Sequence, residues 1–181
     1  KKVSKNFKLI FYLDNKIFSY SHFNLEKNCF EKINKHNINS DKTNLNNEVH
    51  QLINNEKYFY NNYSEVSGVI DTQFCTLIPE SLFDKKNIKE YLDFITNPSK
   101  NTTYLYVRQQ FINCYSIFSI ETQLIETLSD RFHQLQLKTY SSVFIDYTLK
   151  LSSKNNQEVF IWLDKKKFHI TFIENKNLLF Y

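Results

Sequence analysis

The sequence is short of residues that many folds and binding sites rely on. It contains one glycine, Gly68, two prolines, no methionine and no alanine. Asparagine is the residue that tolerates a positive φ best after glycine, so we expect Asn-rich stretches to form the turns that glycine would otherwise form. The excess of Asn, Lys, Ile, Phe and Tyr is typical of an AT-rich genome, and we infer no function from it.

Arginine is scarce as well. Arg108 and Arg131 are the only two, and the formal net charge is +4. Proteins that bind nucleic acids gather Lys and Arg on one face and use Arg for bidentate contacts, so we expect no nucleic-acid partner. The three cysteines, Cys29, Cys75 and Cys114, lack the spacing of metal ligands, and we expect them to be reduced, buried thiols.

Long apolar runs are also missing. No segment approaches the roughly 20 apolar residues that cross a bilayer, and the first residues lack the pattern of a signal peptide. We therefore expect no membrane span and a cytoplasmic location. The chain begins at Lys1 and stops at Tyr181 within a strand-like run, so we expect it to be a fragment of a longer polypeptide.

Apolar residues, by contrast, are plentiful. They make up 41% of 181 residues and aromatics 17%, which is enough for a sizeable core. Period-two patterns predict strands, and spacings of three and four predict helices. We expect strands at 7–13, 17–23, 104–107, 111–118 and 136–140, and a closing meander over 158–181. We expect helices at 43–56, 87–95, 120–132 and 143–151, the third capped by Ser119, and a hairpin that joins 63–70 to 74–78 through Asp71.

One strand-turn-strand unit occurs twice. The segment Leu13–Phe18 (LDNKIF) matches Leu163–Phe168 (LDKKKF) at an offset of 164 − 14 = 150 residues. The match extends in kind to residues 9–12 and 20 on one side and 159–162 and 170 on the other. Two strand-turn-strand units in an aromatic-rich chain can also look alike by chance. Because the two copies begin two successive parts of the chain, we interpret them as marks of a duplicated α/β fold.

The sequence resembles a known family in four stretches: residues 13–19, 67–84, 115–120 and 160–181. The most distinctive stretch is 76–84 (TLIPESLFD). These stretches resemble domain of unknown function 3822, a family of bacterial proteins with an actin-like ATPase fold. The resemblance implies an α/β fold with RNase H-like architecture, in which a mixed sheet has flanking helices. Residues 1–157 would form a first RNase H-like subdomain, and residues 158–181 the opening β-meander of a second that is incomplete in this chain.

The resemblance also implies where a nucleotide would bind. In actin and sugar kinases the turns of two equivalent hairpins read Asp-x-Gly, and their backbone amides hold the phosphates of Mg-ATP. Asp14 and Asp164 occupy the matching positions, but the glycines are replaced by residues whose side chains obstruct the approach of a phosphate. The implied nucleotide-binding residues are Asp14, Asn15, Lys16, Asp164, Lys165 and Lys166.

Two functions are compatible with this pattern. The first is a non-catalytic intracellular scaffold that binds an unknown protein partner, through exposed strand edges or through the aromatic residues Tyr58, Phe59, Tyr60 and Tyr63. Asp14 and Asp164 would then only form turns, because Asp accepts hydrogen bonds from its own turn backbone. The alternative is a degenerate nucleotide-binding ATPase that uses both aspartates. We expect no catalytic residue and no metal site, since no histidine pair or nucleophile motif is present.

Overall fold

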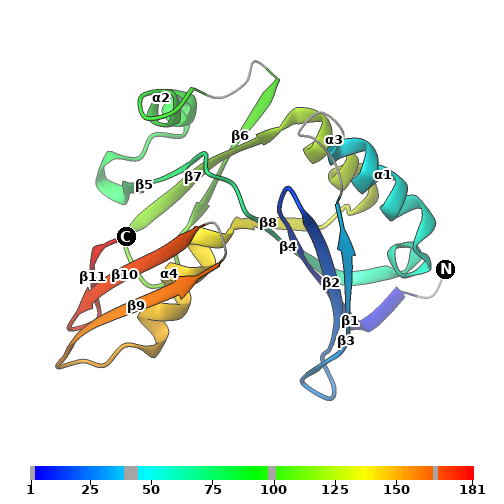
Figure 1. Ribbon diagram of the computed structural model, residues 1–181, viewed down its shortest axis with the longest axis horizontal. Coiled ribbons are helices and arrows are strands. Elements are labelled where there is room, and N and C mark those ends of the chain that lie inside the picture. The colour runs from blue at the N-terminus through cyan, green and yellow to red at the C-terminus, as the bar shows by residue number, and fades with distance from the viewer. Residues whose placement is uncertain (1–2, 39–44, 98–100, 165–166) are drawn as a thin grey trace.

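The protein is described by a computed structural model that covers residues 3–38, 45–97, 101–164 and 167–181. A five-stranded sheet and two three-stranded sheets form its framework, and helices pack between and over them (Figure 1). The five-stranded sheet has the order β3-β2-β1-β4-β8. Its strands are β1 (Val3–Leu13), β2 (Ile17–Asn24), β3 (Cys29–Asn37), β4 (Asn62–Ile70) and β8 (Leu135–Thr139).

Strands β1, β2 and β3 form an antiparallel meander, whereas β4 runs parallel to β1 and β8 runs parallel to β4. The mixed sheet confirms the expected α/β class, and four of its strands were predicted. Strand β3 was not predicted. It lies at the edge of the sheet, most of its side chains are exposed, and its residues are largely polar, so it carries no clear apolar alternation.

A second sheet is inserted between β4 and β8. It consists of β5 (Cys75–Pro79), β6 (Thr102–Arg108) and β7 (Cys114–Glu121) in the order β5-β7-β6. The helix α2 (Ile88–Asp93) and the short 3₁₀ turns η2 (Glu80–Leu82) and η3 (Lys85–Asn87) lie between β5 and β6. The predicted hairpin of 63–70 with 74–78 is therefore wrong. Both strands exist, but β4 pairs with β1 and β8 while β5 pairs with β7.

One face of the five-stranded sheet is covered by α1 (Leu45–Asn55) and α3 (Thr122–Arg131), with the 3₁₀ turn η1 (Lys57–Tyr60) beside them (Figure 1). Among the residues that β1 and β2 contribute to this main core, four are at most 1% exposed: Leu9, Phe11, Leu13 and Phe18. The helices contribute Val49, Ile53, Leu124 and Leu128 to the same cluster. The predicted helices are confirmed, but Ser119 does not cap α3, because it lies inside β7 and Glu121 precedes the helix.

The last part of the chain forms α4 (Tyr140–Leu151) and a three-stranded meander. The meander comprises β9 (Gln157–Leu163), β10 (Phe168–Glu174) and β11 (Asn177–Phe180), as predicted. Helix α4 lies against one face of it, where Ile145 and Leu149 pack on Ile173. The first and last hairpins have the same register, because Leu13 pairs with Phe18 and Leu163 pairs with Phe168.

In two turns of this chain, which has a single glycine, asparagine adopts the left-handed backbone conformation. Asn28 and Asn175 adopt left-handed backbone conformations with φ of 50°, in the turns between β2 and β3 and between β10 and β11. Lys176 is the other non-glycine residue with positive φ in the described chain. Asparagine thus takes the position that glycine often occupies, as the composition predicts.

Gly68 has a different role. It lies in the middle of β4, paired with Phe11 of β1 and Leu137 of β8. A Cβ atom placed on it would collide with the ring of Phe11 and with Leu137. Because Phe11 is fully buried, its ring has little room to move. The single glycine is therefore required by the space between two strands and not by a turn.

We predict that Gly68→Ala lowers the free energy of unfolding by about 1–3 kcal/mol, the usual cost of overpacking a core. Urea unfolding followed by circular dichroism measures it. Ser67→Ala, at the adjacent position of the same strand, is the matched control. If both variants unfold at the same urea concentration, the proposed collision is wrong.

Candidate functional site at the carboxyl edge of the sheet

Three neighbouring parallel strands end level with one another. Leu13 of β1 is paired with Ile70 of β4, and Ile70 is paired with Thr139 of β8. The next residues along the chain are Asp14, Asp71 and Tyr140. In open α/β sheets, ligands bind outside the carboxyl ends of the strands, so this edge is the candidate functional site.

The turn after β1 is closed by its own aspartate. The Oδ1 atom of Asp14 accepts hydrogen bonds from the backbone N–H groups of Lys16 and Ile17, at 2.7 Å each. The backbone N–H of Asp14 in turn donates to the carbonyl oxygen of Ile17 at 3.0 Å. Asp14 therefore stabilises the turn, and its carboxylate occupies two of the turn's amide donors.

Asp71 lies at the centre of the site. The hydroxyl of Tyr12 contacts the Oδ2 atom of Asp71 at 2.8 Å and the Oδ2 atom of Asp14 at 3.0 Å, so the two carboxylates share one hydroxyl donor. The ammonium group of Lys167 forms an ion pair with the same Oδ2 atom of Asp71, whose side chain is only 8% exposed. Burial and the two carboxylates raise the pKa of Tyr12 far above its ordinary value, so this phenol stays protonated.

The second hairpin approaches the site from the other side. The backbone N–H of Asp164 donates to the carbonyl oxygen of Lys167 at 2.9 Å, which matches the bond between Asp14 and Ile17 in the first turn. Lys165 and Lys166 lie outside the described residues. Burial first, and then the charges of Asp71 and Asp164, raise the pKa of Tyr140 to about 12. Asp14 and Asp164 thus belong to the same edge, with Asp71 and the two tyrosines between them.

Aromatic rings surround these carboxylates. The ring of Tyr140 lies 6.1 Å from that of Tyr12, 4.9 Å from Trp162 and 4.8 Å from His169, measured between centroids. His169 shares a hydrogen bond of 2.6 Å between its Nδ1 and the hydroxyl of Tyr181. Burial lowers the pKa of His169, so it is neutral at pH 7. The site is therefore a packed polar and aromatic junction between the five-stranded sheet and the last meander.

The sequence did not identify the central residues of this junction. Asp71 was interpreted as the turn of a hairpin, whereas it follows a parallel strand whose carboxyl end meets that of β1. A signal was available: Asp14 and Asp71 each directly follow an apolar strand. Tyr12 and Lys167 had no such signal, because their contacts with Asp71 join residues that are 59 and 96 positions apart.

The aromatic segment that we expected to form a binding surface is largely internal. Phe59 belongs to the main core and is 1% exposed. Tyr63 is partly buried, and its hydroxyl bonds to His22 and to the carbonyl oxygen of Tyr58, at 2.6 Å each. Only Tyr60 is substantially exposed. These rings pack the protein together and offer little surface to a partner.

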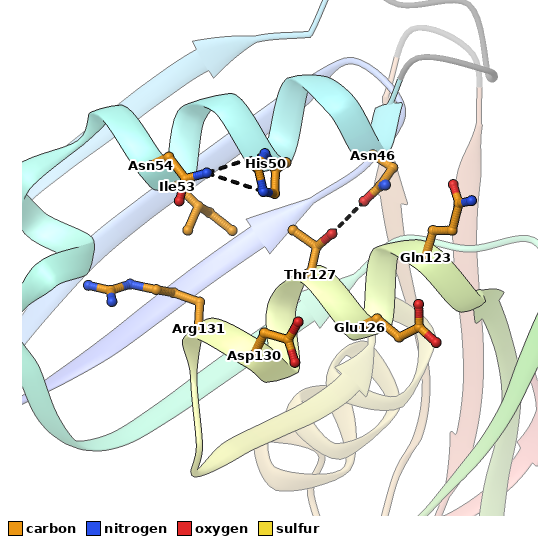
Figure 2. Close-up of a pocket in the computed structure, with 9 residues that line it drawn as sticks. All are labelled: Asn46, His50, Ile53, Asn54, Gln123, Glu126, Thr127, Asp130 and Arg131. Atoms are coloured by element: carbon orange, nitrogen blue, oxygen red, sulfur yellow. Dashed lines mark hydrogen bonds between the residues drawn. The ribbon is translucent and has the colours of Figure 1, made fainter.

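A hollow lies over the helices, away from the strand ends. It has a volume of about 400 Å³ between α1 and α3 (Figure 2). Its lining is mostly polar, and Asn46 accepts a hydrogen bond from Thr127 at 2.8 Å across it. Within the described ranges, no group of three or more His, Cys, Asp and Glu side chains is placed to hold a metal ion. We therefore assign no catalytic or metal-binding role to the polar side chains that line this hollow.

Comparison with known proteins identifies the fold. The model of a family described as "Protein of unknown function (DUF3822)" matches residues 1–181. The chain is also similar to the crystal structure of a Bacteroides thetaiotaomicron protein with an actin-like ATPase fold and unknown function. That similarity has a TM-score of 0.88 at 20% identity and covers 98% of this chain and 69% of that one. The protein therefore has an actin-like ATPase fold.

Two further solved structures are similar to a lesser degree. One is the cytoplasmic domain of EpsL, an inner-membrane component of the Vibrio cholerae type II secretion system. Its TM-score is 0.45 at 7% identity, and the match covers 93% of this chain and 68% of that one. The other is a ROK-family transcriptional regulator, a homologue of E. coli Mlc. Its TM-score is 0.45 at 8% identity, and the match covers 96% of this chain and 38% of that one. No curated protein matches the sequence. Among the described helices, none is long and apolar enough to cross a membrane.

The ion pair at the centre of the site makes a testable contribution to stability. We predict that Lys167→Met lowers the free energy of unfolding by about 2–4 kcal/mol, because it leaves the buried carboxylate of Asp71 without its counter-charge. The double variant Asp71→Asn/Lys167→Met should lose less than Lys167→Met alone, since the neutral amide needs no cation. Urea unfolding at pH 7 measures both.

Lys8→Met is the matched control, because Lys8 pairs with Glu65 at 2.5 Å in a more exposed setting. It should cost less than about 1 kcal/mol. An equal loss in Lys8→Met and Lys167→Met, or a double variant less stable than Lys167→Met, would show that Asp71 does not depend on Lys167.

Proposed function

Because the chain belongs to the DUF3822 family and has an actin-like ATPase fold, we propose that it is a non-catalytic intracellular scaffold that binds a protein partner. The proposal has two parts. The first is that the site at the strand ends binds no nucleotide. The second is that exposed apolar side chains elsewhere on the molecule contact another protein.

The first part of the proposal, that no nucleotide binds, rests on the hydrogen bonds of the turn after β1. Phosphate-binding turns hold their ligand with free backbone N–H groups, and a close approach needs a small side chain. Here the amides of Lys16 and Ile17 already donate to the Asp14 carboxylate at 2.7 Å. A phosphate would have to displace a negatively charged group that is covalently part of the same turn. This is the observation that carries the proposal.

The contacts of Asp71 at the centre of the site also support the proposal that no nucleotide binds there. A magnesium–nucleotide complex needs carboxylates that are open to the metal and its water ligands. Asp71 is buried, is paired with Lys167 and accepts from Tyr12. A lysine ammonium thus takes the place beside this carboxylate where a cation would lie. The residues that surround the carboxylates do not fit Mg-ATP, and we derive no step of hydrolysis from them.

The second part rests on the inserted sheet. The segment around η2 and α2 exposes three large apolar side chains, with Phe94 at 89%, Leu82 at 66% and Ile95 at 54%. Large exposed apolar residues at one end of a domain are typical of protein contact sites. The expectation of buried thiols is wrong for Cys29, which is exposed, and Cys75 and Cys114 are partly buried. The free thiol of Cys29 suits a reducing compartment, in keeping with an intracellular location.

The alternative is a degenerate nucleotide-binding ATPase that uses Asp14 and Asp164 at the two turns. It is favoured by one observation: both turns lie at the edge where three parallel strands end, with Asp71 between them. Strand ends of this kind are where α/β proteins bind ligands. The two functions make opposite predictions for the protein in the presence of nucleotide.

We predict that Mg-ATP does not shift the thermal unfolding midpoint of the protein. A ligand present at 100 times its Kd would stabilise the folded state by about 2.7 kcal/mol, which differential scanning fluorimetry detects easily. Asp14→Ala should unfold at a lower temperature than wild type in the absence of nucleotide, because it loses two hydrogen bonds of the turn.

Asp84→Ala is the matched control. Asp84 also accepts a hydrogen bond from the backbone N–H two residues later, that of Lys86 at 2.9 Å, but it lies in the inserted segment. A saturable stabilisation by Mg-ATP that Asp14→Ala removes and Asp84→Ala keeps would establish nucleotide binding at this site and overturn the first part of the proposal. Native capture that recovers no stoichiometric protein partner would contradict the scaffold part of the proposal.

A further inference from the structure

Strand β6 has one edge that no other described strand pairs with. It ends the inserted sheet, and all of its residues pair with β7 without a register shift. Just beyond β6, the backbone N–H of Gln109 donates to the carbonyl oxygen of Cys114 at 2.9 Å. Because antiparallel strands alternate, the odd-numbered residues of β6 face β7, and the backbone groups of Tyr104 and Tyr106 face outward. Among the described residues, none is hydrogen-bonded to these outward groups of the two tyrosines.

This edge lacks the features that keep edge strands apart. Proteins protect their edges with lysine, proline, bulges or short strands. The edge strand β3 carries Lys32 and Lys35 and has a register shift against β2, whereas β5 is short and ends at Pro79. Strand β6 has seven residues, and its only charged one, Arg108 at its end, is paired within the chain. It is therefore open to pairing with another strand.

The sequence of β6 is nearly symmetrical about Leu105. Residues 103–107 read TYLYV, so the order of residue types is the same in both directions, with one β-branched residue at each end. An antiparallel second copy centred on Leu105 would place its Tyr106 opposite Tyr104 of the first. These are the residues whose backbone groups face outward, so each such pair would exchange both N–H···O bonds. The edge is thus complementary to itself in backbone and side chains, and no like charges face each other.

Exposed aromatic side chains lie beside the same edge. Tyr106 is 37% exposed and Phe94 is 89% exposed. The hydroxyl of Tyr104 donates to the Oδ1 atom of Asp93 at 2.7 Å, so Phe94, the next residue, lies on the tyrosine face of β6. A strand added at this edge would bring further tyrosine rings against these side chains, and cross-strand aromatic pairs stabilise a sheet.

We propose that a second copy of this chain pairs with β6, antiparallel and centred on Leu105, so that two three-stranded sheets join into one across a two-fold axis. The inference rests on the second part of the proposed function, that this end of the molecule contacts a protein, and it names that protein as a second copy. The self-complementary edge is what favours a second copy over an unrelated strand. A single strand pair with flanking rings is a small interface, so the dimer dissociates on dilution.

Disulfide trapping in the full-length natural protein tests the register. Leu105→Cys places two thiols at the symmetry axis, in a pair whose Cα atoms would lie about 4.5 Å apart, within reach of a disulfide. Val107→Cys is the matched control, because Val107 is also partly buried on the same face of β6. Its two copies would lie roughly 14 Å apart, which is too far for a disulfide. Peptide mass spectrometry after mild oxidation identifies the linked residues and separates them from any link through the exposed Cys29.

We predict that the thiols introduced by Leu105→Cys link two copies at least about tenfold faster than those introduced by Val107→Cys. A second comparison does not depend on the folding of these variants. Tyr106→Pro removes an outward N–H and keeps the bonds to β7, whereas Tyr106→Ala loses the same ring contacts but keeps the N–H. In sedimentation velocity, Tyr106→Pro should dimerise about tenfold more weakly than Tyr106→Ala.

Three results would each overturn the inference: wild-type protein that stays monomeric at its highest soluble concentration, equal trapping in the two cysteine variants, or equal dimerisation of Tyr106→Pro and Tyr106→Ala. Capture of a different protein by a chain that stays monomeric would also overturn it, while the proposed scaffold function would stand. A concentration-dependent dimer that Tyr106→Pro weakens and Leu105→Cys traps is the result we expect.

Discussion

The carboxylate of Asp71 sets the arrangement of the two parts of this protein. It lies at the end of a central parallel strand, almost fully removed from water, and a buried carboxylate is tolerated only when it is paired and hydrogen-bonded. Tyr12 supplies a hydroxyl from the neighbouring strand, and Lys167 supplies the counter-charge from the last meander. The need to satisfy this group therefore links the five-stranded sheet to the meander at the edge where the fold would otherwise hold a ligand.

The proposed function follows from the internal hydrogen bonds and ion pair at this edge. The position is the one that α/β proteins use for ligands, yet the carboxylates of Asp14 and Asp71 both have partners within the protein. Asp14 accepts from its own turn, Tyr12 donates between two carboxylates, and the rings of Tyr140 and His169 pack beside them. The actin-like framework thus holds its two hairpins in position while their contacts are made internally, which is the basis of the proposed scaffold function.

Much of this could be predicted from the sequence, where local patterns decide the structure. The hairpins at Asp14 and Asp164 and the helix stripes follow from spacing alone, and the resemblance in residues 76–84 indicated the family. The pairing of β4 with β1 could not be predicted, because apolar alternation does not tell a strand which neighbour it will join. Asp71 was missed for that reason, and Lys167 was missed because its contact spans 96 residues. The edge strand β3 was missed because exposed strands lack an apolar face.

Asp14 holds the amides of the first turn, and we propose that they are therefore not available to a phosphate. The most direct measurement is a ¹H–¹⁵N NMR titration of the protein with Mg-ATP to millimolar concentration, following the backbone N–H signals of Lys16 and Ile17. We predict that both signals stay in place and that their amide hydrogens exchange slowly with solvent. Saturable shifts of these two signals, with matching shifts around Asp71, would contradict it.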